Sequence, residues 1–288
     1  MRFVFKILQI GLTPVLAVGT QFLTLSSTAQ ELAVGSHPAS SFYSSVNPAL
    51  YYAPKSNPKF SISQGSWFGG ASNSSISYNQ RFKTRTLHFR LDHTDLYDLE
   101  LREDKPIDKP LAYFSAFGFS ATIGLSNNTR RGSYGFSLSK IQMGIFNQSA
   151  DGYIIGGGYL HRFKKSFSIG FSVINLGTLS KFDLKKPDLP TRVLVGFEKK
   201  ILFKNYIDNI YATIEWNKSS AKYQFWLGNM FRWKSLVIMA GSSFNQNIFT
   251  SSIGFGLKSR GYSIYYGIRF GSQNIGYPQS ISVDIPLP

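Results

Sequence analysis

The sequence contains no cysteine, few charged residues, and a long apolar stretch only at its N-terminus. Asp, Glu, Lys and Arg together make up 16% of the 288 residues, whereas average soluble domains contain about 25%. The lack of cysteine excludes disulfide frameworks, thiolate metal sites, thiol nucleophiles and a lipid-modified N-terminal cysteine. Beyond the N-terminal stretch, no segment has the roughly 18 consecutive apolar residues that a transmembrane helix requires.

Aromatic residues and glycine, by contrast, are abundant. Phe, Tyr and Trp supply 16% of the sequence, and there are 26 glycines. This mixture favours pleated, closely spaced strands over helices. The length suits one large barrel, so the composition predicts an all-β protein.

The N-terminal residues have the pattern of a secretory signal peptide. Arg2 and Lys6 precede an apolar run from Ile7 to Leu25, and four small residues follow, ending at Ala29. This order predicts a signal peptide over residues 1–29 that is removed after Ala29. An uncleaved membrane anchor is the alternative, but proline, glycine and glutamine interrupt the run and no stop-transfer flank follows it.

Apolar residues alternate with small or polar residues throughout residues 58–288. In one example Phe167, Ile169, Phe171 and Val173 alternate with Ser166, Ser168, Gly170 and Ser172. Strands with two different faces have this period. A soluble sandwich also alternates, but its outer face is normally rich in Lys, Glu, Asp and Thr, whereas here the second face is mostly Ser and Gly.

The alternating segments number fourteen, near residues 59–68, 73–82, 85–93, 112–124, 132–141, 152–163, 166–175, 191–201, 208–217, 221–231, 235–244, 247–258, 261–271 and 278–287. Their lengths suit tilted strands that cross an outer membrane. Closing the sheet into a barrel also removes the edge strands, whose unpaired backbone N–H and C=O groups would have no hydrogen-bond partner in lipid. The sequence therefore predicts a transmembrane antiparallel β-barrel of about fourteen strands over residues 58–288, with twelve or sixteen strands left open.

The charges separate between the two sets of connections. The turns after the even-numbered strands are all basic, and they form a candidate periplasmic basic rim of Lys83, Arg85, Arg130, Arg131, Lys164, Lys165, Lys199, Lys200, Arg232, Lys234, Lys258 and Arg260. Acidic residues gather in the longest connections, near 94–111 and 176–190. A nucleic-acid-binding surface usually gathers basic residues in one patch or stripe, whereas here the positive charge is spread over six turns. We therefore expect that nucleic acid is not a partner of this protein. Anionic lipid head groups are the favoured partner of the rim, with an acidic docking partner as the alternative.

No constellation of residues points to catalysis, a metal or a cofactor. His88 and His93 lie five residues apart, so on one strand they face opposite sides and cannot share a metal. Gly156, Gly157 and Gly158 fall within a strand and open no helix, so they allow a bend in the barrel wall rather than a phosphate-binding loop. We expect a protein that is not an enzyme and has no cofactor.

Residues 30–57 differ from the rest of the chain. Phe42, Val46, Leu50 and Tyr51 have roughly helical spacing, and Asn47, Pro48 and Ala49 lie among them. An N-terminal piece of this kind is able to enter a barrel lumen as a short plug, with Asn47 capping a turn and Pro48 at its first position. A disordered periplasmic tail is the alternative.

Several short motifs resemble the PorV/PorQ-like outer-membrane proteins, which are related to the fourteen-stranded FadL barrels. The motifs are Asn47-Pro48-Ala49, Val173-Ile174-Asn175-Leu176-Gly177, Leu189-Pro190 and Val193-Leu194-Val195-Gly196-Phe197. The resemblance implies a protein of the outer membrane of a Gram-negative bacterium. It further implies an accessory or shuttle role in type IX protein secretion, with secretion-system proteins and secreted cargo as partners.

A FadL-like channel for hydrophobic small molecules is the alternative function. A channel predicts an apolar pocket inside the barrel and a lateral opening, whereas a secretion role predicts a blocked lumen and outer loops that bind a partner. In both cases outer-membrane lipid surrounds the barrel.

Overall fold

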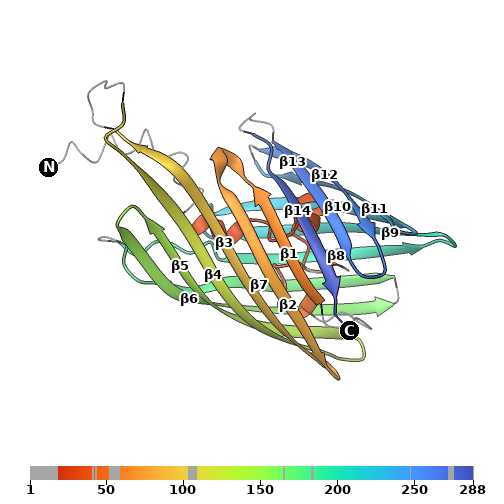
Figure 1. Ribbon diagram of the computed structural model, residues 1–288. Coiled ribbons are helices and arrows are strands. Elements are labelled where there is room, and N and C mark those ends of the chain that lie inside the picture. The colour runs from red at the N-terminus through yellow and green to blue at the C-terminus, as the bar shows by residue number, and fades with distance from the viewer. Residues whose placement is uncertain are drawn as a thin grey trace.

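The computed structural model describes residues 19–40, 42, 44–51, 59–102, 109–164, 166–182, 185–246, 248–271 and 276–287. These residues form a closed barrel of fourteen antiparallel strands, in which each strand pairs with its sequence neighbours and β1 pairs with β14 (Figure 1). Closure leaves no unpaired sheet edge for lipid to meet. The predicted fold class and the count of fourteen strands are confirmed.

The strands are β1 (Lys59–Ser66), β2 (Ser72–Phe82), β3 (Arg85–Leu101), β4 (Ala112–Asn128), β5 (Gly132–Ile145), β6 (Gln148–Lys164), β7 (Phe167–Leu179), β8 (Arg192–Leu202), β9 (Tyr206–Asn217), β10 (Lys222–Trp233), β11 (Leu236–Phe244), β12 (Phe249–Lys258), β13 (Ser263–Gly271) and β14 (Gln279–Pro286). The described residues also include four short helices: η2 (Thr20–Thr24), α2 (Ala29–Val34), η3 (Pro48–Tyr51) and η4 (Phe68–Gly70). No helix among the described residues has the length and apolarity needed to cross a membrane.

The largest departure from the predicted boundaries lies in β3. This strand was expected to end near residue 93, but its pairing with β4 continues to Leu101, opposite Ala112. Asp95, Asp98 and Glu100 therefore lie on a strand rather than in an acidic loop. Backbone pairing does not require an apolar face, so the hairpin continues past residue 93, with a register shift between Leu96 and Leu99.

The outer face of the barrel is apolar and the inner face is polar, the reverse of a soluble protein. On the first hairpin, for example, Ile62 and Ile76 are exposed whereas Ser61 and Ser77 are buried. Exposed aliphatic residues encircle the middle of the barrel, among them Ile123, Leu138, Ile155, Val195, Ile214, Ile238, Ile253 and Ile281. An apolar outer belt of this kind matches the hydrocarbon layer of a membrane.

Exposed aromatic residues form two girdles that border the aliphatic belt. We call the rim that holds the β2–β3, β4–β5, β6–β7, β8–β9, β10–β11 and β12–β13 connections the short-turn rim, and the opposite rim the loop rim. The girdle of the short-turn rim includes Phe82, Phe163, Phe203, Trp233 and Tyr262, and that of the loop rim includes Tyr97, Tyr113, Phe146, Tyr223, Phe244, Phe249 and Tyr277. Paired girdles mark the two membrane interfaces of outer-membrane barrels.

The residues of the candidate basic rim are placed at the short-turn rim. They lie within the connections or near the strand ends that flank them. Lys165 lies outside the described residues, and only the backbone of Lys164 is described. The described residues of the candidate basic rim therefore lie together at one end of the barrel, the end at which β1 begins and β14 ends.

The N-terminal segment fills the lumen, and Figure 1 shows its red helical turns enclosed by the strands. The segment passes from one rim to the other. At the loop rim, the Thr20 hydroxyl donates to the Asp188 carbonyl at 2.7 Å. Toward the short-turn rim, the Tyr51 ring stacks on His88 of β3 with ring centroids 4.0 Å apart.

This luminal segment begins earlier than the plug predicted at residues 30–57. Residues 19–29, which the sequence analysis assigned to the signal peptide, lie inside the barrel, and most of residues 27–51 are buried. The part of the predicted plug from 52 to 57 lies outside the described residues.

Candidate functional site

Helix α2 is built around a buried carboxylate. The Thr28 hydroxyl accepts a hydrogen bond from the Glu31 backbone N–H at 3.2 Å, which caps the helix. The Glu31 carboxylate, whose residue is 1% exposed, accepts from the Ser27 backbone N–H at 3.1 Å and from the Ser44 and Ser45 hydroxyls at 3.1 and 2.8 Å. Several donors are what a buried charge requires, so Glu31 ties the two halves of the luminal segment together.

Two wall arginines bind this segment from the barrel side. Arg192 on β8 forms a buried bidentate ion pair with Glu215 on β9, at 2.6 and 2.8 Å, and also donates to the Ser36 hydroxyl at 3.2 Å. Arg269 on β13 donates to the Leu32 carbonyl at 3.0 Å. That carbonyl lies near the C-terminal, electronegative end of α2, where a cation is favourable.

The residues predicted as a plug, Asn47, Pro48 and Ala49, lie in the lumen. The Asn47 side chain donates to the Pro38 carbonyl at 2.6 Å and accepts from the Ala49 backbone N–H at 2.9 Å, and Pro48 opens η3. The Ala49 carbonyl in turn accepts from Ser133 on β5 at 2.9 Å. These contacts hold the turn against the wall near the short-turn rim.

Two aromatic rings of the luminal segment rest on glycines of β4. The Phe22 ring contacts Gly118, and the Tyr51 ring contacts Gly124, at positions where any side chain would overlap the ring. Gly118 and Gly124 are six residues apart and so face the same side of the strand. The glycines of β4 thus leave space in the lumen for the two rings of the luminal segment.

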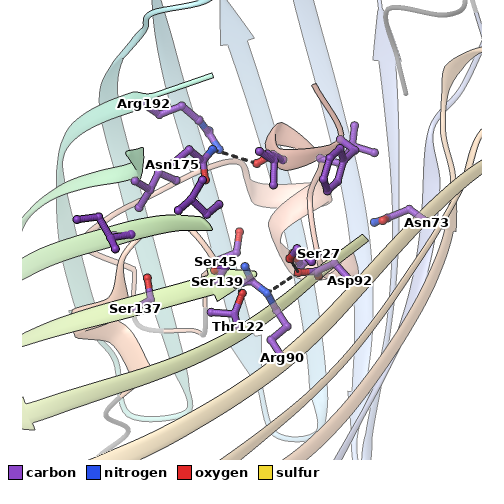
Figure 2. Close-up of a pocket in the computed structure, with 18 of the residues that line it drawn as sticks. Ser27, Ser45, Asn73, Arg90, Asp92, Thr122, Ser137, Ser139, Asn175 and Arg192 are labelled. Carbon is purple, nitrogen blue, oxygen red and sulfur yellow. Dashed lines mark hydrogen bonds and ion pairs between the residues drawn. The ribbon is translucent and has the colours of Figure 1, made fainter. Parts of the chain in front are cut away.

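A small cavity remains between the luminal segment and the wall, with a volume of about 50 Å³. Its apolar lining residues include Phe22, Leu23, Leu25, Ile154, Ile155 and Ile174. Its polar lining residues are more numerous and include Ser27, Ser45, Asn73, Arg90, Asp92, Ser120, Thr122, Ser137, Ser139, Asn175 and Arg192 (Figure 2). Among the polar residues, Arg90 and Asp92 form an ion pair at 2.7 Å.

The barrel wall is irregular beside this cavity. In the pairing of β6 with β7, Gly156 stands opposite two residues, Ile174 and Asn175, and Asn175 has a φ of 60°. The pairing of β7 with β8 ends at Ile174. The side-chain amide of Asn175, labelled in Figure 2, donates to the Pro190 carbonyl at 3.2 Å and to the Leu23 carbonyl at 3.4 Å. The bulge is thus fastened to the luminal segment by one side chain.

The described residues hold no group of three or more His, Cys, Asp or Glu side chains placed to bind a metal. His88 is buried against Tyr51, whereas the side chain of His93 is 45% exposed and contacts Asp95 at 3.2 Å. The two histidines therefore point to different surroundings.

The sequence analysis did not identify the luminal role of residues 19–29. A signal for it was present, because Thr28 and Glu31 have the spacing of a capping box, which predicts a helix that begins at Ala29. No comparable sequence pattern predicts the bulge at Asn175, since the residues that Asn175 contacts are distant in the sequence.

No protein-family model matches the sequence, and no curated protein matches it. Solved structures, however, resemble the fold over nearly its whole length. The CymD monoaromatic hydrocarbon channel has a TM-score of 0.70 and 10% sequence identity, covering 91% of this chain and 97% of that chain. The Pseudomonas putida toluene transporter TodX has a TM-score of 0.63 and 12% identity, covering 90% and 96%. A Pseudomonas aeruginosa FadL homologue has a TM-score of 0.57 and 12% identity, covering 90% and 98%.

At these low identities the comparisons establish the fold, which is that of FadL-like outer-membrane β-barrels. This fold agrees with the outer-membrane location that the sequence predicts. The resemblance to FadL barrels is therefore confirmed at the level of fold, whereas none of these neighbours singles out PorV/PorQ proteins or type IX secretion.

Proposed function

We propose that this protein is a non-enzymatic outer-membrane channel for small hydrophobic molecules. The observation that carries the proposal is the position of the cavity. Its apolar lining residues include Leu23 and Ile174, and Ile174 is the neighbour of Asn175 in the wall bulge. The whole-length likeness to proteins described as hydrocarbon channels supports the same function.

The conformation described here corresponds to a closed channel. A cavity of about 50 Å³ is large enough for water, whereas an apolar cavity that binds benzene has a volume of about 150 Å³. A hydrocarbon therefore needs part of the lining to move. Helix η2 and the residues up to Leu25 are the candidates, because they lie at the loop rim and are not part of the barrel ladder.

The proposed route enters at the loop rim and leaves through the wall. Residues 27–40 fill the lumen below the cavity and are almost entirely buried, so an axial route would require the displacement of α2 and its buried Glu31. The bulge offers a shorter path, since displacing Leu23 removes the hydrogen bond that ties the Asn175 side chain to the luminal segment, at a point where the β7–β8 ladder has already ended.

An accessory role in type IX secretion is the second candidate. The filled lumen favours it, because the sequence analysis expected a blocked barrel for that role. Under this proposal the loop rim would bind secretion-system proteins or cargo, and no small molecule would pass.

The experiment measures uptake of a labelled monoaromatic hydrocarbon by cells that make the protein and otherwise lack such channels. Two disulfide pairs are compared in the cysteine-free chain, Phe22→Cys with Gly118→Cys, and Tyr51→Cys with Gly124→Cys. Each pair lies where an aromatic ring contacts a glycine of β4, so both disulfides would link the luminal segment to the same strand. Oxidation of the Phe22 pair is expected to stop uptake and reduction to restore it.

The Tyr51 pair is the control for the route. It locks only the end of the segment near the short-turn rim, so a lateral route predicts that uptake continues when it is oxidised. Loss of uptake with both pairs would instead favour an axial route. Uptake no greater than in cells without the protein, together with co-purified secretion proteins, would reject the channel in favour of the second candidate.

A further inference from the structure

Residues 20–29 of the luminal segment are held in the barrel by apolar packing and by hydrogen bonds. Phe22 is buried in an apolar cluster with Ile141, Met143 and Leu179. Asn73 on β2 donates to the Ser26 carbonyl at 3.1 Å, in addition to the Thr20 contact at the loop rim. Residues 20–29 thus contribute to the hydrophobic core of the lumen, to its hydrogen bonding and to the cavity wall.

A chain that began at Gln30 would lose the elements that hold α2 in place. Thr28 caps the helix and Ser27 donates to Glu31, and both would be removed. The new α-ammonium would lie in the first turn of the helix at Gln30, which is 6% exposed. A positive charge is unfavourable at a helix N-terminus, and a buried charge requires partners.

The leader sequence itself offers an earlier cleavage position. Signal peptides have an apolar region of about 7 to 15 residues followed by small residues at the first and third positions before the cut. The run from Ile7 to Leu25 is longer than that, whereas Ile7–Leu16 fits and is followed by Ala17, Val18 and Gly19. Ala17 and Gly19 occupy the two positions that require small side chains.

We propose that signal peptidase cleaves between Gly19 and Thr20, so that the mature chain keeps residues 20–29 as the loop-rim half of its plug. The peptide bond before Thr20 is hydrolysed, which leaves a carboxylate on Gly19 and an α-amino group on Thr20. The new terminus lies at the loop rim, next to the Asp188 carbonyl. Phe22, Leu23 and Leu25 then line the cavity. This assignment is independent of what crosses the barrel.

The test is to express the complete precursor in a Gram-negative host, isolate the outer membranes, and determine the intact mass and the N-terminal sequence. The expected chain spans residues 20–288 and begins Thr20-Gln21-Phe22. An N-terminus at Gln30, at any other residue, or at Met1 would overturn the proposal.

Two variants localise the cut. Gly19→Leu places a large side chain directly before the proposed bond and is expected to accumulate the precursor. Ala29→Val places one directly before the alternative bond and is expected to leave the N-terminus at Thr20. Cleavage precedes barrel folding, so the N-terminal sequence can be read even if a variant folds poorly. Normal processing of Gly19→Leu, or accumulation of precursor in Ala29→Val, would contradict the assignment.

Discussion

The ring of Phe22 lies directly against Gly118, at a point on β4 where even a methyl group would overlap it. Phe22 belongs to the luminal segment and lines the cavity, whereas Gly118 belongs to the barrel wall. The closed state of the cavity therefore depends on the absence of a side chain at one wall position.

Gly118→Val is expected to displace the Phe22 ring and loosen η2. Overpacking of this kind typically costs about 1 to 3 kcal/mol, and the displaced segment opens the cavity toward the loop rim. We expect a lower free energy of unfolding in lipid vesicles and a higher leak of a small apolar dye through the barrel.

The matched control is Gly261→Ala, because nothing lies within 4 Å of a β-carbon built at Gly261. It is expected to change neither quantity. In the double variant that combines Gly118→Val with Phe22→Ala, the ring that the valine would overlap is absent. The loss of stability in the double variant should therefore be smaller than the sum of the losses in the two single variants. Strictly additive effects would show that the contact does not set the position of η2.

The buried pair of Arg192 and Glu215 gives a second prediction. Glu215→Gln keeps a hydrogen-bond acceptor for the Trp226 indole, which donates to Glu215 at 3.0 Å, but leaves the Arg192 charge unpaired. Breaking one partner of a buried pair costs about 3 to 5 kcal/mol. Unfolding in guanidinium chloride should show a loss of that size.

Two further variants separate charge from packing. Arg192→Met with Glu215→Leu removes both charges and should recover much of the lost stability, since apolar replacement of a buried pair is often neutral. Glu100→Gln breaks the exposed pair with Arg102 and should leave unfolding unchanged, because exposed pairs contribute little. Equal losses in Glu215→Gln and Glu100→Gln would contradict the argument.

The barrel could be predicted from the sequence because its alternation is local. Each strand shows its lipid face within a few residues, as Phe167, Ile169 and Phe171 do, so the number of strands and their order follow from counting. The turn charges reinforced the same segmentation. The end of β3 was missed because backbone pairing past residue 93 depends on β4, not on the composition of β3 itself.

The lumen was harder to predict because its contacts join residues far apart in the chain. Leu23 and Asn175 meet although 152 residues separate them, and no local pattern marks that contact. Phe22, Leu23 and Leu25 are apolar because they pack inside the barrel, yet in the sequence they extend the apolar run of the leader. One apolar run thus covers both the predicted leader and residues of the luminal segment, so the sequence pattern alone does not separate the two.

His37 gives a pH-dependent prediction. Its ring lies between the Thr213 hydroxyl, at 2.9 Å, and the Val34 carbonyl, at 3.1 Å. Burial lowers the pKa of His37 from 6.5 to about 4, against a smaller opposing effect of the hydrogen bond to Val34. The unfolded chain therefore binds a proton that the folded chain does not, between about pH 6.5 and pH 4.

Folding stability should accordingly fall as the pH decreases through that window. The full effect is about 3 kcal/mol, from about 1.4 kcal/mol for each pH unit. Carboxylates also titrate in this pH window, so the wild-type protein is compared with the His37→Gln variant. The free energy of unfolding of both proteins is measured at pH 7.5 and at pH 4.5. The wild type should lose more stability than the variant, and a pH-independent difference would show that His37 does not titrate with folding.

The orientation of the barrel gives the last prediction. Outer-membrane barrels place short turns in the periplasm and longer loops outside. The short-turn rim, which carries Lys83, should therefore face the periplasm, and the loop rim, which carries Asn147, should face the exterior. Both residues are exposed in turns, and the sequence contains no other cysteine. A maleimide linked to a polymer too large for porins should label Asn147→Cys in intact cells and Lys83→Cys only after lysis. The opposite pattern would reverse the orientation and place the basic rim, with its proposed anionic lipid partners, on the outer surface.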